Sequence, residues 1–153
     1  MDRDIRTERL ETYQRLCREQ GLRSTVQKRA ILEAVLDLDN HPTADQVYEA
    51  VVRDIPDISR TTVYRALEGF ARLGLISKTC HPGSSIRYDS KIELHHHLVC
   101  LQCDSVTDIS DPGLDTLTIP NTSGFGFDVQ EFRVQLRGLC RRCREHPPEG
   151  GRE

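Results

Sequence analysis

The 153-residue sequence lacks several features that would assign it to a familiar class of protein. It has no tryptophan, and aromatic residues make up only 5% of it, so a core must be built mainly from Leu, Ile, Val and Ala. No run approaches the roughly 20 apolar residues of a membrane-spanning helix, and the charged start MDRDIRTERLE lacks the apolar centre of a signal peptide. These absences predict a soluble, cytoplasmic protein with no membrane partner.

An excess of positive charge is missing as well. The formal net charge is −3, and residues 1–83 carry equal numbers of basic and acidic side chains. Any DNA contact must therefore come from a local basic patch. The motifs H-x-E and H-E-x-x-H are also absent, so no glutamate is placed as the general acid or base of a zinc hydrolase or deaminase. We expect no enzyme, and a hydrolase or a metal store remains a distant alternative.

The first half of the chain predicts four helices followed by a β-hairpin. A helix over residues 3–20 has Ile5, Leu10, Tyr13 and Leu16 on its apolar face. Further helices are expected after Thr25, after Thr43 with the capping-box spacing to Gln46, and after Ser59. Gly74 ends the fourth helix, and residues 75–79 and 86–88 are predicted strands around HPGSS. This order is typical of a winged helix-turn-helix domain.

The start of the fourth helix contains the candidate DNA contacts. In a helix-turn-helix motif the second helix enters the major groove with its N-terminal residues facing the bases. Arg60 and Arg65 can reach phosphates or guanine edges, and Tyr64 can contact sugar, phosphate or a thymine methyl group. The candidate residues are Ser59, Arg60, Thr61, Thr62, Tyr64 and Arg65. A solvated helix face explains the same pattern, so the residues alone leave both interpretations open.

Four of the six cysteines form two C-x-x-C pairs, Cys100 with Cys103 and Cys140 with Cys143. In a reducing compartment this spacing favours metal binding over disulfides. Structural Zn²⁺ prefers a closed tetrahedron of such thiolates. We therefore predict a structural zinc site, with two unrelated thiol pairs or a redox switch as alternatives. Cys17 and Cys80 have no partner in sequence and are expected to be ordinary core or surface thiols.

The histidine run 95–97 is followed directly by LVC, which predicts a strand. Alternation along a strand places His95 and His97 on one face and His96 on the other. Two imidazoles on one metal need further ligands, and Asp89, Asp108 and His41 are candidates. Taken singly, each of these residues could equally be solvent-exposed or satisfied by a backbone hydrogen bond.

Several segments together resemble the ferric uptake regulator (Fur) family over about residues 20–143. They are GLRSTVQKRAILEAV, HPTADQVYEAV, SRTTVYRALEGFARLGLI, RYD, HHHLVCLQC and the final C-x-x-C. The resemblance implies an α+β chain with a winged helix-turn-helix domain over 1–89, a hinge to about 94 and a small α/β dimerisation domain over 95–145. Residues 146–153 are expected to be a disordered tail. The resemblance to the family also implies a metal-dependent repressor that binds an inverted-repeat DNA operator as a homodimer.

The resemblance further implies roles for individual residues. It places structural Zn²⁺ on the paired cysteines and a regulatory Fe²⁺ or Mn²⁺ between the domains, on His41, Asp89, His95, His97 and Asp108. Aspartate at positions 89 and 108 is similar to the peroxide-responsive PerR branch, whereas iron-sensing members tend to have glutamate at the latter. That branch implies oxidation of His41 or His95 by Fe²⁺ and peroxide, followed by release of DNA. An iron- or zinc-responsive repressor is the alternative.

Some members have a third metal site near the histidine run. Here only His96, Asp115 and Glu131 remain for it, and Phe132 stands where a histidine is needed. We expect this third site to be absent or degraded.

Overall fold

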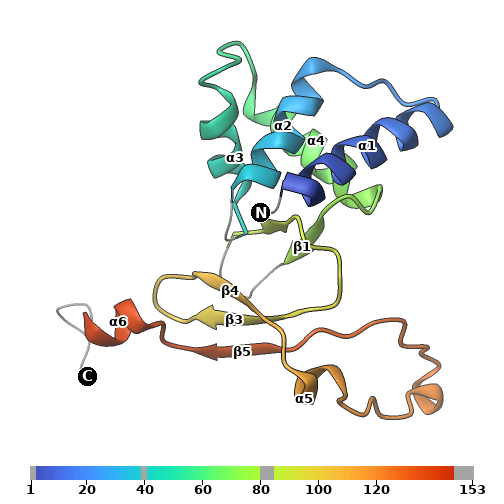
Figure 1. Ribbon diagram of the computed structural model, residues 1–153. Coiled ribbons are helices and arrows are strands. Elements are labelled where there is room, and N and C mark those ends of the chain that lie inside the picture. The colour runs from blue at the N-terminus through green and yellow to red at the C-terminus, as the bar shows by residue number, and fades with distance from the viewer. Residues whose placement is uncertain (1–2, 39–40, 80–84, 147–153) are drawn as a thin grey trace. The chain divides into compact units, whose positions relative to one another are not determined.

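The computed structural model describes residues 3–38, 41–79 and 85–146 (Figure 1). The chain divides into two compact units, Met1–Ile92 and Glu93–Glu153. Among the described residues, no helix is long and apolar enough to cross a membrane. The expectations for Cys80, for the hairpin tip at 81–84 and for the tail from 147 onward fall outside the described residues.

The first unit contains four helices and a two-stranded hairpin, which confirms the predicted winged helix-turn-helix. The elements are α1 (Arg3–Glu19), α2 (Val26–Asp37), α3 (Ala44–Val51), α4 (Arg60–Arg72), β1 (Ser77–Thr79) and β2 (Arg87–Asp89). All three predicted N-caps are present. Thr25 and Ser59 each accept a backbone N–H at the start of α2 and α4, and Thr43 forms a reciprocal capping box with Gln46. The helix starts are therefore set by local hydrogen bonds that the sequence specifies.

The core of the first unit is formed by the apolar faces of its helices. The Tyr13 and Phe70 rings meet edge to face, with centroids 5.5 Å apart, and join α1 to α4. Cys17 is buried in this core one turn beyond Tyr13, whereas Leu16 only packs against it. Cys17, which was expected to be an ordinary core or surface thiol, is a core residue.

The hairpin differs in detail from the predicted strands. Gly74 ends α4 with a φ of +67°, and Leu75 and Ile76 then enter the core before β1 begins at Ser77. The antiparallel pairing joins Ser77 to Asp89, so Asp89 lies within β2 instead of following it. The predicted strand over 75–79 is therefore too long at its start, because residues 75 and 76 are buried in the helical core before β1 begins.

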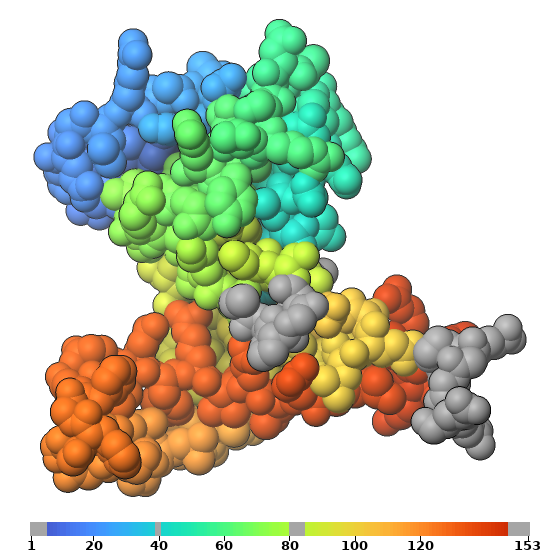
Figure 2. Space-filling view, turned by 180° about the vertical axis from the view of Figure 1, so that it is seen from behind, coloured from blue at the N-terminus to red at the C-terminus, as the bar shows by residue number. Residues whose placement is uncertain are grey.

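The second unit is built on a three-stranded sheet. Its elements are β3 (His96–Cys100), β4 (Val106–Ile109), α5 (Pro112–Asp115), the 3-10 turn η1 (Ser123–Phe125), β5 (Gln135–Gly138) and α6 (Arg141–Glu145). The central strand β3 pairs antiparallel with β4 and parallel with β5. The segment with α5 and η1, orange in Figure 2, lies at one end of the unit, and α6 lies at the other. The predicted α+β class is confirmed.

Candidate metal centres and recognition helix

The four paired cysteines come together at one end of the second unit. Cys100 ends β3, Cys103 lies in the turn after it, and Cys140 and Cys143 lie at the start and inside of α6. Their sulfur atoms all lie within 4.8 Å of one another, and Cys103 Sγ is 3.8 Å from Cys140 Sγ. Two ligands of a tetrahedral Zn²⁺ with Zn–S bonds of about 2.3 Å are about 3.8 Å apart. The arrangement therefore fits a zinc tetrathiolate.

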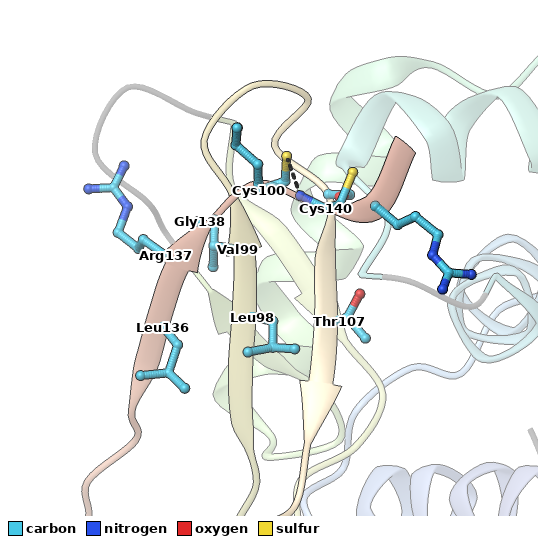
Figure 3. A pocket seen from close by; sticks show the side chains of 11 residues that line it. Leu98, Val99, Cys100, Thr107, Leu136, Arg137, Gly138 and Cys140 are labelled. Carbon is cyan, nitrogen blue, oxygen red and sulfur yellow. Dashed lines mark hydrogen bonds between the residues drawn. The ribbon is translucent and has the colours of Figure 1, made fainter. Parts of the chain in front are cut away.

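Strand pairing brings these distant segments together. The parallel register places Cys100 beside Gly138, and the N–H of Leu101 donates to the Gly138 carbonyl at 2.8 Å. The N–H of Cys140 then points at Cys100 Sγ at 3.4 Å, as the dashed line in Figure 3 shows. A backbone N–H directed at sulfur favours the thiolate over the thiol. The β3–β5 ladder thus positions both cysteine pairs.

The surroundings separate the pKa values of the thiols. Hydrogen bonding to Ser105, whose hydroxyl lies 3.2 Å from the sulfur, lowers the pKa of Cys103 to about 6. The N–H of Cys140 lowers the pKa of Cys100. Burial instead raises the pKa of Cys143 to about 12. Without a metal, Cys143 therefore keeps its proton at neutral pH, and zinc must displace that proton to bind this sulfur as a thiolate.

The second unit also holds a cluster of two histidines and an aspartate. His95 Nε2 and His97 Nε2 are 3.0 Å apart, and Asp108 Oδ1 lies 3.7 Å from the first and 3.9 Å from the second. The β3–β4 register puts His97 opposite Asp108. His95 Nδ1 lies 2.7 Å from the Glu93 carbonyl, which can only accept, so Nδ1 carries the proton and Nε2 the lone pair. That tautomer is the one a metal bound at Nε2 requires.

The first unit contributes a separate pair. His41 Nε2 lies 3.3 Å from Asp89 Oδ2, although 48 positions separate the two residues in sequence. The other carboxylate oxygen of Asp89 accepts the N–H of Lys91 at 2.8 Å. His41 has a φ of +54°, a left-handed conformation that costs a residue other than glycine about 1–2 kcal/mol. An imidazole and a carboxylate in contact supply two N/O donors suited to a divalent metal.

The candidate DNA contacts lie at the exposed start of α4, with two differences from expectation. Ser59 and Thr62 bond to each other, since Ser59 Oγ accepts the Thr62 N–H at 3.1 Å and lies 2.9 Å from its hydroxyl. Arg60 forms an ion pair with Asp45 of α3 and lies over the Tyr48 ring, 4.3 Å from its centroid. To contact DNA, Arg60 must exchange Asp45 for a phosphate or base. No motif signals this pair, because it joins two helices 15 residues apart.

Three candidates present their side chains openly. Thr61, Tyr64 and Arg65 are exposed, and Tyr64 retains 46% of its accessible surface. Together with Asp45 and Arg60 they line a shallow groove of about 330 Å³ over the N-terminal ends of α3 and α4. Such a surface suits a phosphate backbone and base edges better than a small apolar ligand.

Comparison with known proteins decides the family. The sequence model of the ferric uptake regulator family matches residues 19–137. The chain belongs to this family. Fur-family proteins are metal-responsive transcription regulators and not enzymes. The chain is 34% identical over 128 residues to the peroxide-responsive repressor PerR of Staphylococcus aureus (strain Mu50 / ATCC 700699), which covers 84% of this chain and 86% of that protein.

Solved structures agree with this assignment. The Campylobacter jejuni peroxide stress regulator is 26% identical, with a TM-score of 0.64 over 84% of this chain and 97% of that one. The Helicobacter pylori ferric uptake regulator has a TM-score of 0.79 over 94% of this chain and 96% of that one. Its identity is 19%, so it supports the fold only.

The Helicobacter pylori protein is described as having three functional metal binding sites. In this Fur-family chain His96 points away from His95 and His97, and its Nε2 lies 3.0 Å from Asp115 Oδ1. The Val134 N–H donates to His96 Nδ1 at 3.1 Å, so the ring proton resides on Nε2 and is donated to Asp115. Phe132 stacks on the ring at 6.0 Å, and Glu131 is exposed. Both nitrogens of His96 are therefore engaged by the protein itself.

Proposed function

We propose that this Fur-family regulator is a metal-dependent DNA-binding repressor that senses peroxide. The observation that carries the proposal is the ligand type: His95, His97 and Asp108 form one cluster of N and O donors, and His41 and Asp89 form another. No thiolate belongs to either. The 34% identity to a peroxide-responsive repressor supports the same function. An iron- or zinc-responsive repressor without peroxide sensing is the alternative.

The two clusters are proposed to hold one Fe²⁺ or Mn²⁺. Imidazole and carboxylate donors suit both ions, and a five-donor set leaves one octahedral position for a small molecule. Neither cluster suffices alone, since one offers three donors and the other two. Zn²⁺ on the four cysteines would have all its coordination positions filled by thiolates, so this site has no role in sensing in the proposal.

A metal shared by both clusters would favour the arrangement of the two units in which all five donors meet. It can shift that equilibrium only by the difference in its affinity for the two arrangements. In a homodimer this arrangement would set the spacing of the two α4 helices to match the half-sites of an inverted repeat in cytoplasmic double-stranded DNA. Asp108 and Asp89 would then act on DNA affinity through geometry, without touching DNA.

The sheet of the second unit offers a surface for the homodimer. Leu98 of β3 and Leu136 of β5 lie on the same face beside Thr107 of β4 (Figure 3), and the two leucines keep 40% and 44% of their accessible surface. They line an open groove of about 440 Å³. We propose that a second copy of the chain covers this face, because exposed leucines in adjacent strands gain free energy when buried.

Peroxide sensing requires a reaction that damages the ligand set. Bound Fe²⁺ would supply the redox chemistry that breaks the O–O bond of peroxide next to a ligand imidazole. One oxygen atom then adds to a ring carbon of His41 or His95, and the other leaves as water, so the ring loses two electrons and peroxide gains them. The oxidised ring no longer binds the metal, and the repressor releases DNA. Mn²⁺ in the same position would resist this reaction.

Mass spectrometry tests the proposal. Zinc-loaded protein carrying Fe²⁺ or Mn²⁺ is treated with peroxide, and peptides holding His41, His95 and His96 are compared. We expect one added oxygen on His41 or His95 with Fe²⁺ and none with Mn²⁺, accompanied by loss of operator binding in a gel shift. His96 is the internal control. Absence of the adduct while DNA binding persists would favour the iron-responsive alternative.

The ligand assignment is tested separately by Asp108→Ala. This variant should lose metal-dependent DNA binding while the zinc content stays unchanged, because Asp108 belongs to no part of the cysteine site. Asp115→Ala, which removes a carboxylate from the opposite side of β3, is the matched control. Normal repression by Asp108→Ala would show that the assignment is wrong.

A further inference from the structure

His41 adopts a backbone conformation that its sequence neighbours oppose. Its φ is +54°, one of two positive values among the described residues other than glycine. Pro42 follows directly, and a residue before proline is normally driven to an extended conformation with negative φ. With an extended backbone, as local preferences favour, the His41 imidazole would point in another direction. Some tertiary contact must therefore hold this residue in place.

The contacts that hold it come from β2. The Arg87 guanidinium donates from Nη1 to the His41 carbonyl at 3.1 Å. The Tyr88 N–H donates to the Pro42 carbonyl at 2.9 Å, and Thr43 forms a β-bridge with Arg87. Of these three contacts to the His41–Thr43 backbone, the one from Arg87 is made by a side chain, so a substitution can remove it without breaking the other two.

The same strand carries the carboxylate that faces the His41 ring. Arg87 and Asp89 are two positions apart on β2 and share one side of it, while Tyr88 points to the other side and is fully buried. Arg87 thus fixes the His41 backbone, and Asp89 lies 3.3 Å from its ring. One ligand, Asp89, and the support of the other, Arg87, therefore lie within the three residues of β2.

We infer that Arg87 is a positioning residue for the regulatory metal: it holds His41 in the left-handed conformation and so presents the imidazole beside Asp89. The inference rests on the proposed regulatory site and adds a residue to it. Arg87 touches no metal. It acts by ordering a ligand before the metal arrives, so that binding need not supply the ordering free energy.

The test measures Mn²⁺ affinity on zinc-loaded protein by competition with a fluorescent chelator. Arg87→Met keeps the aliphatic stem and removes the donors, and Arg53→Met removes an exposed arginine of the same unit as the matched control. We expect Arg87→Met to bind Mn²⁺ about 10- to 100-fold more weakly, the usual effect of losing a residue that orients a ligand. Zinc content and Arg53→Met should match the parent protein. Arg87→Lys should recover part of the affinity, because its ammonium group can donate to the same carbonyl.

A double-mutant cycle with His41→Ala separates positioning from a general structural role. If Arg87 acts through His41, Arg87→Met should weaken Mn²⁺ binding no further in the His41→Ala background. An equal weakening in both backgrounds would overturn the inference, as would a parent-like affinity of Arg87→Met when His41→Ala alone binds weakly. If His41→Ala itself leaves Mn²⁺ affinity unchanged, the proposed regulatory site is wrong. Should Arg87→Met not fold, Arg87→Gln takes its place in the same cycle.

Discussion

Two buried tyrosines of the first unit should respond in opposite ways to loss of the hydroxyl. Tyr88 is completely buried, and its hydroxyl lies 3.2 Å from Glu68 Oε1, which links β2 to α4. Tyr13 is 2% exposed, and its hydroxyl lies near the side chains of Ser24 and Cys17 but forms no hydrogen bond of ordinary geometry with a described residue. We therefore predict that Tyr88→Phe destabilises the unit, whereas Tyr13→Phe is neutral or stabilising.

The magnitudes follow from the partners. A hydrogen bond to a charged group contributes about 1.5–3 kcal/mol. The Glu68 side chain is 25% exposed and stays paired with Lys78 at 2.8 Å, so the Tyr88→Phe cost should lie near the lower end, about 1.5 kcal/mol. A buried hydroxyl without a partner costs about 1–3 kcal/mol of desolvation, so its removal should return up to about 1 kcal/mol.

The chain offers a convenient signal for this comparison. It has no tryptophan, and its four tyrosines all lie before residue 89, so tyrosine fluorescence during urea unfolding reports the first unit alone. A loss of 1.5 kcal/mol should lower the melting temperature of a unit of this size by roughly 6–12 °C. Equal shifts for the two variants, or a stabilised Tyr88→Phe, would refute the reasoning. Each variant retains three tyrosines, so the signal survives the substitution.

The pH dependence gives a second check on the same contact. Lys78 and, to a smaller extent, Tyr88 hold the pKa of Glu68 below its usual range. A carboxyl group whose pKa is lower in the folded chain than in the unfolded chain, where it is about 4.3, stabilises the fold at pH values above about 4.3. That stability is lost as the pH falls through the pKa of the folded state. The cost of Tyr88→Phe should therefore be full at pH 7 and smaller at acid pH. A cost that does not change with pH would assign it to packing and not to the Glu68 contact.

Three further measurements test other parts of the structure. Ser59→Ala removes the cap of α4 and should cost about 1 kcal/mol in urea unfolding. An unchanged stability would mean that the cap is dispensable. Gly74→Ala should cost about 1–2 kcal/mol of unfolding free energy because Gly74 has a left-handed backbone conformation. Gly69→Ala, inside α4, places a Cβ with no atom within 4 Å and should stabilise the unit by up to about 1 kcal/mol. A Gly74→Ala variant more stable than Gly69→Ala would contradict the backbone conformation of Gly74. Zinc binding at pH 7–8 should release at least one proton, from Cys143, so the affinity for zinc should rise with pH. Calorimetry in buffers of different ionisation enthalpy measures the number of protons released. The absence of proton release would contradict the raised pKa of Cys143.

Local signals account for the parts of the fold that could be predicted. Thr25, Thr43 and Ser59 cap helices because a side-chain oxygen there satisfies an N–H three residues ahead, and such contacts depend on neighbours in sequence. The alternation along β3 likewise separates His96 from His95 and His97 whatever lies around the strand. These features needed no knowledge of tertiary structure.

Contacts between distant segments could not be predicted in this way. The Asp45 partner of Arg60, the Asp115 and Val134 partners of His96, and the support of His41 by Arg87 all join separate elements. Each residue type can form many such pairs, and spacing in sequence does not choose among them. The contacts change how a residue is interpreted: Arg60 already has a partner, and both ring nitrogens of His96 contact other parts of the second unit.

The sequence by itself therefore determined the order of elements in the first unit, the starts of α2, α3 and α4, the face on which each histidine of the run lies and the pairing of cysteines into two thiol motifs. These depend on the period of helix and strand and on short-range hydrogen bonds. Only the tertiary structure decided that the four sulfurs lie within 4.8 Å of one another, that Cys17 is a core residue and that His41 holds a left-handed conformation before Pro42. Those outcomes depend on the β3–β5 ladder, on helix packing and on one arginine 46 residues away in sequence. Local rules cannot specify them, because the stabilising partner lies outside the segment it stabilises.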